Sequence, residues 1–285
     1  MAMQTLIDVH QLRQHLDDAE WRVVDCRFAL ADPPKGRQAY LEHHIPGAVY
    51  AHLDEDLSSP IVPGVTGRHP LPDVEKLAAK FSAWGINSFT KVVAYDDNNG
   101  GYASRLWWLL RWLGHSNVWV LDGGYNAWQQ AAYPVSAEIP NIQPQAFVPN
   151  IRPELVVDAQ FVEQVRQDGH YAVVDSREAK RYAGEWEPID PVAGHIPGAY
   201  NAPFAENMRP DGHWQDPQTL KERFDHLLGP RPDDHVVFYC GSGVTACHNI
   251  LAYAHAGLGE ARLYSGSWSE WIADHGRPVA KSADR

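Results

Sequence analysis

The sequence has few cysteines, an excess of acidic over basic residues and no long apolar run. Its 285 residues include 3 cysteines, which are too few and too unevenly spaced for a disulfide framework or a four-ligand zinc site. The 24 lysines and arginines face 36 aspartates and glutamates, a formal net charge of −12. A general nucleic-acid binder needs the opposite excess, because its cations must replace the counterions of phosphate. We therefore expect no nucleic-acid partner.

The chain also lacks the signals of secretion and of membrane insertion. The N-terminus shows no basic region followed by an apolar stretch, and no run of about 18 apolar residues occurs. We therefore expect no signal peptide, no membrane span and a location in the reducing cytoplasm. The hydrophobic share of 44% and the charged share of 21% are ordinary for a globular protein. At roughly 150 residues per domain, the length suggests two domains.

The second half of the chain repeats motifs of the first half in the same order. Four pairs of segments match at offsets of 143 to 151 residues, namely 23–27 with 173–177, 44–48 with 195–199, 92–95 with 236–239 and 121–128 with 264–271. A solenoid would repeat at about 20 to 50 residues, so these offsets indicate a duplicated domain. Between the copies, 5 prolines over residues 134–153 predict an extended linker. We expect a non-catalytic domain at 1–140, a linker at 141–153 and a catalytic domain at 154–285.

Each half alternates strand patterns with helix patterns. Short β-branched runs predict strands at residues 21–25, 91–95, 118–121, 171–175, 235–239 and 261–264. Apolar residues recur at helical spacing over residues 103–113 and 246–258. The alternation predicts an α/β fold of two tandem domains, each a mainly parallel sheet flanked by helices on both faces. In such sheets ligands bind at the carboxyl ends of the strands.

Cys240 ends one of these predicted strands, and a loop containing glycines follows it into a helix. Gly241 and Gly243 let backbone N–H groups turn inward, which forms a concavity that accepts a thiolate or persulfide beside a helix N-terminus. Taken alone, the spacing fits a small buried cysteine beside a tight turn equally well. In the first half, however, Asp96 matches Cys240, so one copy has a nucleophile and the other does not. We expect the ligand cleft between the two domains.

As a set, these paired motifs resemble the two-domain rhodanese-like sulfurtransferases over nearly the whole chain. The resemblance implies that Cys240 accepts a sulfane sulfur from a small-molecule donor and becomes a persulfide. The sulfur then passes to a thiol or to cyanide, and thioredoxin is among the thiol acceptors to be considered. No metal and no organic cofactor are needed for this chemistry, and we expect a monomer.

The loop at residues 240–245 is similar to that of 3-mercaptopyruvate sulfurtransferases. Thiosulfate-specific members carry arginine and lysine after the cysteine, where this chain has Gly241 and Ser242. In the mercaptopyruvate subfamily a serine, a histidine and an aspartate form a proposed proton relay, and the matching residues here are Ser242, His69 and Asp54. Such a relay takes the proton of the donor thiol while the cysteine attacks its sulfur. We expect the backbone N–H groups of Gly241, Gly243, Val244 and Thr245 to stabilise the sulfur anion.

The same subfamily holds the donor's carboxylate and carbonyl with two arginines, and only one of them has a match here. Arg181 matches the first, whereas residues 187–191 read Glu-Pro-Ile-Asp-Pro where the family has an arginine after Glu-Pro. The missing arginine weakens the mercaptopyruvate assignment, because arginine is the best bidentate partner of a carboxylate. Arg68 is one candidate to replace it. A thiosulfate sulfurtransferase and a persulfide carrier that delivers sulfur to a partner protein are the alternatives.

Phosphatase chemistry and several other reactive side chains are set aside. A phosphatase of related fold needs a loop one residue longer than residues 240–245 to surround phosphate. We expect ion pairs with a structural role between Asp25 and Arg27 and between Asp175 and Arg177, and packed thiols at Cys26 and Cys247. The tryptophans of the helix at 103–113 are expected to pack in the core or at the domain interface, namely Trp107, Trp108 and Trp112.

Overall fold

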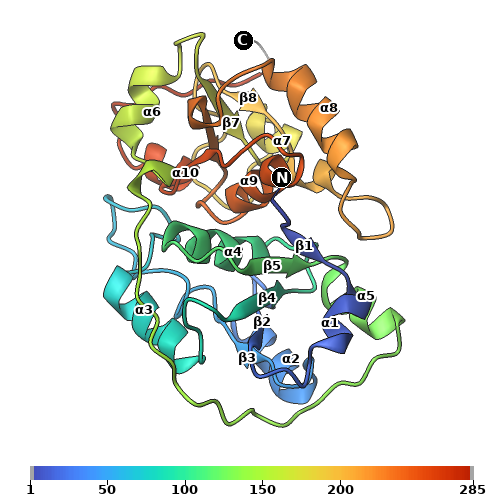
Figure 1. Ribbon diagram of the computed structural model, residues 1–285. Coiled ribbons are helices and arrows are strands. Elements are labelled where there is room, and N and C mark those ends of the chain that lie inside the picture. Colours follow the sequence, from blue (N-terminus) through green and yellow to red (C-terminus); the bar gives the residue numbers. More distant parts are fainter. Residues whose placement is uncertain (1–2, 283–285) are drawn as a thin grey trace.

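The structure, a computed structural model, describes residues 3–282, so the expected outer domain limits at residues 1 and 285 lie outside it. Each half of the chain forms a five-stranded sheet (Figure 1). The strand order is β1-β5-β4-β2-β3 in the first sheet and β6-β10-β9-β7-β8 in the second, and neighbouring strands are parallel. The two orders are equivalent, so the sequence repeat corresponds to two copies of one topology. The predicted α/β fold is confirmed.

The N-terminal domain contains the first sheet and five α-helices. Its strands are β1 (Leu6–Ile7), β2 (Trp21–Asp25), β3 (Val49–Tyr50), β4 (Lys91–Tyr95) and β5 (Val118–Leu121). Its helices are α1 (Val9–Gln14), α2 (Pro34–Glu42), α3 (Val74–Ala83), α4 (Ala103–Trp112) and α5 (Gly124–Gln130). The central strands β2, β4 and β5 lie where the β-branched runs predicted them. The edge strands β1 and β3 pair over two residues each, which is too short for a periodic pattern in the sequence.

The C-terminal domain repeats this arrangement. Its strands are β6 (Val156–Val157), β7 (Ala172–Asp175), β8 (Tyr200–Asn201), β9 (Val236–Tyr239) and β10 (Arg262–Tyr264). Its α-helices are α6 (Ala159–Val165), α7 (Ala179–Tyr182), α8 (Pro217–Leu228), α9 (Ala246–His255) and α10 (Ser267–Trp271). Three short 3-10 helices are η1 (Pro153–Leu155), η2 (Phe204–Asn207) and η3 (Asp233–His235). None of the helices in the described part of the chain has the length and apolar character of a membrane span.

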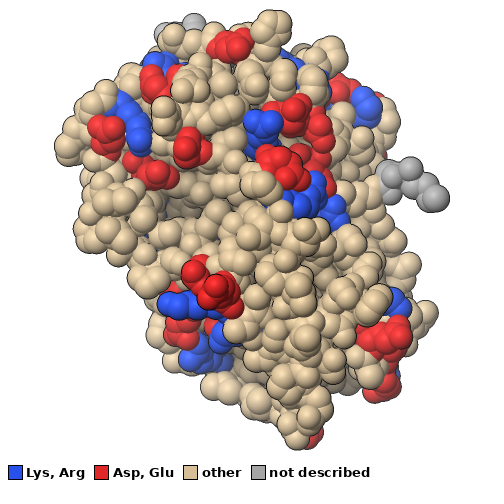
Figure 2. Space-filling model, turned by 60° about the vertical axis from the view of Figure 1, so that its left-hand side comes forward, with Lys and Arg blue, Asp and Glu red and all other residues tan. Residues whose placement is uncertain are grey.

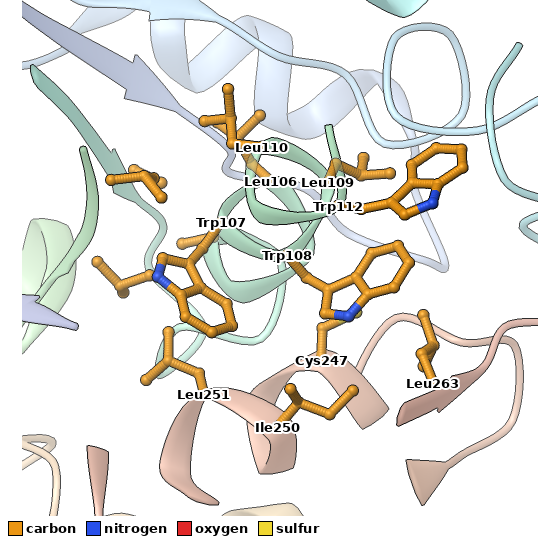
Figure 3. Packing of buried hydrophobic residues seen from close by; sticks show 14 of the residues in the cluster. Leu106, Trp107, Trp108, Leu109, Leu110, Trp112, Cys247, Ile250, Leu251 and Leu263 are labelled. Atoms are coloured by element: carbon orange, nitrogen blue, oxygen red, sulfur yellow. The ribbon is translucent and has the colours of Figure 1, made fainter. Parts of the chain in front are cut away.

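Helices α4 and α9 pack against each other between the two sheets and join the domains. Figure 3 shows Trp107 and Trp108 of α4 pointing toward Ile250, Leu251 and Cys247 of α9. Side chains of both domains belong to this one hydrophobic cluster, which confirms the expected packing role of the tryptophans. Each large apolar side chain buried there stabilises the contact by about 1.5–3 kcal/mol. An apolar interface of this kind holds two domains in one relative orientation, so residues of both can build a common site.

The segment between the two sheets, residues 134–152, runs along the outside of the N-terminal domain (Figure 1). It contains no helix or strand, and backbone hydrogen bonds attach it to the N-terminal domain, among them Gln145 N–H to the Ser82 carbonyl at 2.9 Å and Arg152 N–H to the Trp112 carbonyl at 2.8 Å. Arg152 also contacts Glu260 of the C-terminal domain at 2.7 Å. The segment thus connects the domains and pairs with both.

Candidate active site

The loop that follows β9 places Cys240 at the carboxyl end of the second sheet. Cys240 is buried, and its Sγ accepts a hydrogen bond from the N–H of Gly243 at 3.2 Å. Its own N–H donates to the hydroxyl of Ser267 at 3.1 Å. Gly243 has a φ of +79°, and a Cβ atom there would lie 2.3 Å from the Ser265 carbonyl oxygen, so this turn requires glycine. The loop therefore turns a backbone N–H toward the sulfur.

Ser242, His69 and Asp54 form a hydrogen-bonded chain across the domain interface. The hydroxyl of Ser242 lies 2.7 Å from Nδ1 of His69, and Nε2 of His69 lies 3.2 Å from Oδ1 of Asp54. Burial lowers the pKa of His69, while Asp54 acts in the opposite direction, and the hydrogen bond with His69 lowers the pKa of Asp54. A neutral imidazole that donates from Nε2 to Asp54 accepts from the Ser242 hydroxyl at Nδ1. This geometry suits a relay that moves one proton.

A close approach between the domains puts His69 in this position. His69 belongs to a loop of the N-terminal domain, and its neighbour Gly67 would bring a Cβ atom within 2.4 Å of the Gly266 carbonyl oxygen. The N–H of Arg68 donates to the hydroxyl of Ser269 at 3.0 Å. Glycine at position 67 thus allows the loop to reach the start of α10, beside the Cys240 loop.

Two arginines from different domains meet beside Gly241. A Cβ atom on Gly241 would lie 2.8 Å from Nη2 of Arg68 and 3.6 Å from Nη2 of Arg181. Arg181, on α7, pairs with Glu187 at 2.7 Å and with Asp190 at 3.1 Å, and Arg68 pairs with Asp190 as well. Residues 187–191 carry no arginine, but Arg68 reaches the same place from the other domain.

These groups line one cavity of about 190 Å³. Its polar lining includes Cys240, Ser242, His69, Arg68 and Arg181, and Thr245 and the backbone of Gly241 and Val244 complete the loop side. Apolar side chains cover much of the rest, namely Leu30, Leu53, Tyr102, Ile189 and Phe204. Asp54 contacts His69 but is absent from the lining, so it acts on the cavity through the imidazole. The cavity has the size of a small metabolite site with an anion-binding side.

Arg105 is a residue of this site that the sequence analysis missed. It lies on α4, is fully buried and donates to the carbonyl oxygens of Gly243 at 3.1 Å, His69 at 3.3 Å and Leu57 at 3.4 Å. Within residues 3–282 no carboxylate pairs with it. The helix contains two cations, and Arg111 pairs with Glu260 near its C-terminal end, whereas Arg105 stands among apolar residues of the first turns. Arg105 joins the His69 loop to the Cys240 loop through these carbonyls and places a positive charge behind both loops.

The other two cysteines and the two ion pairs lie where the sequence placed them. Cys247 and Cys26 are buried, and burial raises the pKa of Cys247 to about 12 and that of Cys26 well above its usual range. Neither thiol lines the cavity. The ion pairs of Asp25 with Arg27 and of Asp175 with Arg177 are present at 2.7 Å and 2.6 Å. Arg177 also lines the cavity, so the expectation that it lies outside the site is wrong.

The charged surface gives the molecule no obvious polyanion-binding face in the view drawn. Figure 2 shows acidic and basic side chains in small mixed groups, without a broad basic area. In the cavity, Arg68 and Arg181 lie side by side with their carboxylate partners Asp190 and Glu187. A small anion fits this distribution better than an extended one.

Comparison with known proteins assigns the class. The rhodanese-like domain model matches residues 8–131 and again residues 158–274. The chain belongs to the rhodanese-like family, in its two-domain form, and is a sulfurtransferase.

The relatives include both donor types. The chain is 49% identical to a probable 3-mercaptopyruvate sulfurtransferase of Pseudomonas aeruginosa, over 98% of this chain and 99% of the relative. It is 33% identical to the thiosulfate sulfurtransferase of Bos taurus, over 88% of this chain and 84% of the relative. The solved structure of 3-mercaptopyruvate sulfurtransferase from Leishmania major matches with a TM-score of 0.83 and 31% identity, over 97% of this chain and 76% of that one.

Proposed function

We propose that the protein transfers sulfur from 3-mercaptopyruvate to a thiol or to cyanide through a persulfide on Cys240. The observation that carries the proposal is the chain from Ser242 through His69 to Asp54, with Ser242 and Cys240 lining the same cavity. A thiol donor has a proton to lose, and its carbon leaving group has a proton to gain. Thiosulfate needs neither transfer. A proton relay at the cavity therefore favours the thiol donor, and the Pseudomonas aeruginosa relative is a probable 3-mercaptopyruvate sulfurtransferase.

In the first half-reaction the Cys240 thiolate attacks the sulfur of the donor. A bond forms between Sγ and that sulfur, and the carbon–sulfur bond breaks with its electron pair going to carbon as the enolate of pyruvate. The thiol proton passes through the Ser242 hydroxyl to His69 and returns to the enolate carbon. The products are the Cys240 persulfide anion and pyruvate.

In the second half-reaction an acceptor attacks the outer sulfur of the persulfide. The sulfur–sulfur bond breaks, and its electron pair returns to Sγ of Cys240. Cyanide leaves as thiocyanate, and a thiol leaves as its own persulfide. The N–H of Gly243 and the positive charge of Arg105 stabilise the sulfur anion at both stages.

Arg68 and Arg181 hold the donor's carboxylate in this proposal. Both line the cavity next to Gly241 of the Cys240 loop. Because Gly241 has no side chain, both guanidinium groups can lie close to this loop. Two guanidinium groups bind a carboxylate with directed, charge-assisted hydrogen bonds. Arg68 then binds the donor carboxylate in place of the arginine that residues 187–191 lack.

Thiosulfate is the second candidate donor, for a specific reason. The same arginine pair suits a small dianion, and the Bos taurus relative is a thiosulfate sulfurtransferase. With this donor the relay of Ser242 and His69 has no proton to move, so the two donors make different demands on one site.

The test is kcat/KM with 3-mercaptopyruvate and with thiosulfate, each measured with cyanide and with a dithiol as acceptor. We expect a preference for mercaptopyruvate of at least about tenfold, which corresponds to about 1.4 kcal/mol of transition-state stabilisation. A preference for thiosulfate would replace the proposed donor by the second candidate. Inactivity with both donors would overturn small-molecule turnover in favour of a persulfide carrier.

A further inference from the structure

The carboxylate of Asp190 lies between the two arginines of the cavity. Its Oδ1 pairs with Nη1 of Arg68, and its Oδ2 accepts from Nη2 of Arg181 at 3.1 Å. The side chain of Asp190 is 2% exposed. A single carboxylate that receives N–H groups from two guanidinium groups has the arrangement that a bound carboxylic acid adopts. Asp190 thus stands where an external carboxylate would bind.

The ionic cluster around Asp190 has no spare positive charge. Its ion pairs join three arginines to three carboxylates, which are Arg68, Arg177 and Arg181 with Asp175, Glu187 and Asp190. A donor carboxylate added to this balanced cluster would leave one buried negative charge without a partner, which is strongly unfavourable. One of the three resident carboxylates must therefore leave the arginines when an anionic donor enters.

Asp190 is the least firmly held of the three. Asp175 is fully buried and receives both the guanidinium group and the N–H of Arg177. Glu187 pairs with Arg177 and Arg181 and also accepts the backbone N–H groups of Ile189 and Asp190, both at 3.1 Å. In the part of the chain that the structure describes, the Asp190 carboxylate bonds to the two arginines alone.

The chain around Asp190 also offers room for a movement. It belongs to the segment between α7 and β8, which carries no helix or strand at this point. The preceding residue, Ile189, lies at the mouth of the cavity with 47% of its surface exposed. A rotation of the Asp190 side chain releases the arginines and leaves the N–H groups of Ile189 and Asp190 on Glu187.

We propose that Asp190 is an internal competitor of the donor, occupying the carboxylate position between Arg68 and Arg181 until the donor displaces it. This inference rests on the proposed function, since it takes the donor to be a small carboxylic acid. Asp190 then sets the affinity for the donor, because binding is weakened by the fraction of molecules in which the arginines are occupied. It also acts on specificity, since a donor without an anionic group cannot replace a carboxylate there.

The test compares Asp190→Asn with Asp211→Asn in the full-length protein. Asp211 pairs with Arg209 on the surface, so its substitution removes the same charge from an ion pair outside the cavity. Two quantities are measured: KM and kcat with 3-mercaptopyruvate, and the Kd of pyruvate, the donor without its sulfur, by titration calorimetry. For Asp190→Asn we expect KM and the pyruvate Kd to fall about tenfold with kcat changed less than twofold. Asp211→Asn should match the parent protein in all three values.

Several outcomes would overturn the proposal. Unchanged or higher values of KM and pyruvate Kd in Asp190→Asn would mean that the carboxylate positions the arginines for the donor and does not compete with it. Absence of pyruvate binding in both the parent protein and Asp190→Asn would mean that no carboxylate site exists there. If 3-mercaptopyruvate is not turned over by any of the proteins, the proposed function fails, while the ratio of pyruvate Kd values still decides the role of Asp190.

A crystal structure of the unsubstituted protein with pyruvate tests the same point and does not depend on whether a variant folds. We expect the pyruvate carboxylate between Arg68 and Arg181, and the Asp190 carboxylate out of hydrogen-bond range of both. Pyruvate bound elsewhere, with Asp190 still joining the arginines, would contradict the proposal.

Discussion

The loops after β4 and β9 are equivalent in the two domains, and the frames around them are nearly the same. The N–H of Tyr125 donates to the Asp96 carbonyl at 2.8 Å in the first domain, and the N–H of Trp268 donates to the Cys240 carbonyl at 3.0 Å in the second. Residue 124 has a φ of 56° and residue 267 a φ of 57°, so even an unusual backbone conformation is shared. The two loops differ in what the frame holds.

In the N-terminal domain the loop closes on its own carboxylate. Oδ1 of Asp96 accepts the N–H groups of Asn98 and Gly100, and Oδ2 accepts those of Tyr102 and Ala103, each at 2.8 Å. All four N–H groups bind the Asp96 carboxylate, which is part of the protein and not a ligand. The same backbone concavity that can stabilise a sulfur anion therefore serves here to fix a loop.

In the C-terminal domain the loop holds a sulfur atom beside a cavity. The Gly243 N–H reaches Sγ of Cys240, and the N-terminal domain supplies His69 and Arg105 to the same place. The C-terminal domain thus supplies Cys240 and Ser242, and the N-terminal domain supplies His69 and Arg105 beside them. The comparison teaches that the duplicated frame alone carries no chemistry, because the reactive atom and its partners are added at the loop and across the interface.

The largest expected effect comes from the atom that differs between the two loops. Cys240→Ser should lower kcat/KM for sulfur transfer by about 10³-fold or more, because a hydroxyl cannot carry the sulfane sulfur. Cys26→Ser and Cys247→Ser should stay within about threefold, since both thiols are buried outside the cavity and have raised pKa values. Steady-state rates and the mass gain of one sulfur atom on the donor-treated protein check this. Full turnover by Cys240→Ser would show that Cys240 is not the nucleophile.

The next effect concerns the stability of the closed loop. Asp96→Asn replaces a carboxylate oxygen by an NH₂ group that faces two N–H donors, so two buried donors lose their acceptor. We expect the free energy of unfolding to fall by about 2–4 kcal/mol, while kcat of the folded enzyme stays within about twofold. Urea denaturation with Asp97→Asn as the exposed control measures the difference. Equal unfolding midpoints for the two variants would show that the Asp96 carboxylate does not hold the loop.

The fold follows from the sequence because its central strands carry long local patterns. The β-branched runs at 91–95 and 118–121 coincide with β4 and β5, and those of the second half agree within about a residue with β7, β9 and β10. The edge strands β1, β3, β6 and β8 have two residues each, and pairing of that length leaves no periodic signal. What the local sequence encodes weakly is therefore the edge of each sheet.

The site required more than local patterns. Cys240 could be found from the end of a strand and the glycines after it, whereas His69 and Asp54 were selected among many polar residues by family resemblance. The structure brings His69 to Ser242, 173 positions away in the sequence, and to Asp54, 15 positions away. Their roles in catalysis stay predictions. The contacts of Arg105 with Gly243 and of Arg68 with Asp190 depend on how two domains dock, and no pattern within either segment predicts a partner in the other.

The smallest expected effect tests what the N-terminal domain contributes through Asp54. Burial lowers the pKa of His69, and Asp54 partly offsets this by stabilising the protonated ring. A relay that accepts a proton needs the neutral ring, so kcat/KM should fall as the pH drops through the pKa of His69. Asp54→Ala removes the carboxylate that raises this pKa, which should move the acid limb of the kcat/KM profile to lower pH.

The shift should be small because the Asp54 side chain is 45% exposed and solvent screens its charge. We expect about half a pH unit, together with a fall of about tenfold in the plateau value as the ring loses its orienting partner. The acid limb is measured with 3-mercaptopyruvate as donor. Asp97→Ala is the control, because Asp97 is exposed. Asp56→Ala would be unsuitable, because Asp56 binds Lys80 and the His52 backbone. A shift of the limb to higher pH would mean that the carboxylate acts on a group other than His69. Asp54 would then have no electrostatic effect on His69, and the charges that the N-terminal domain brings to the site would be those of Arg68 and Arg105.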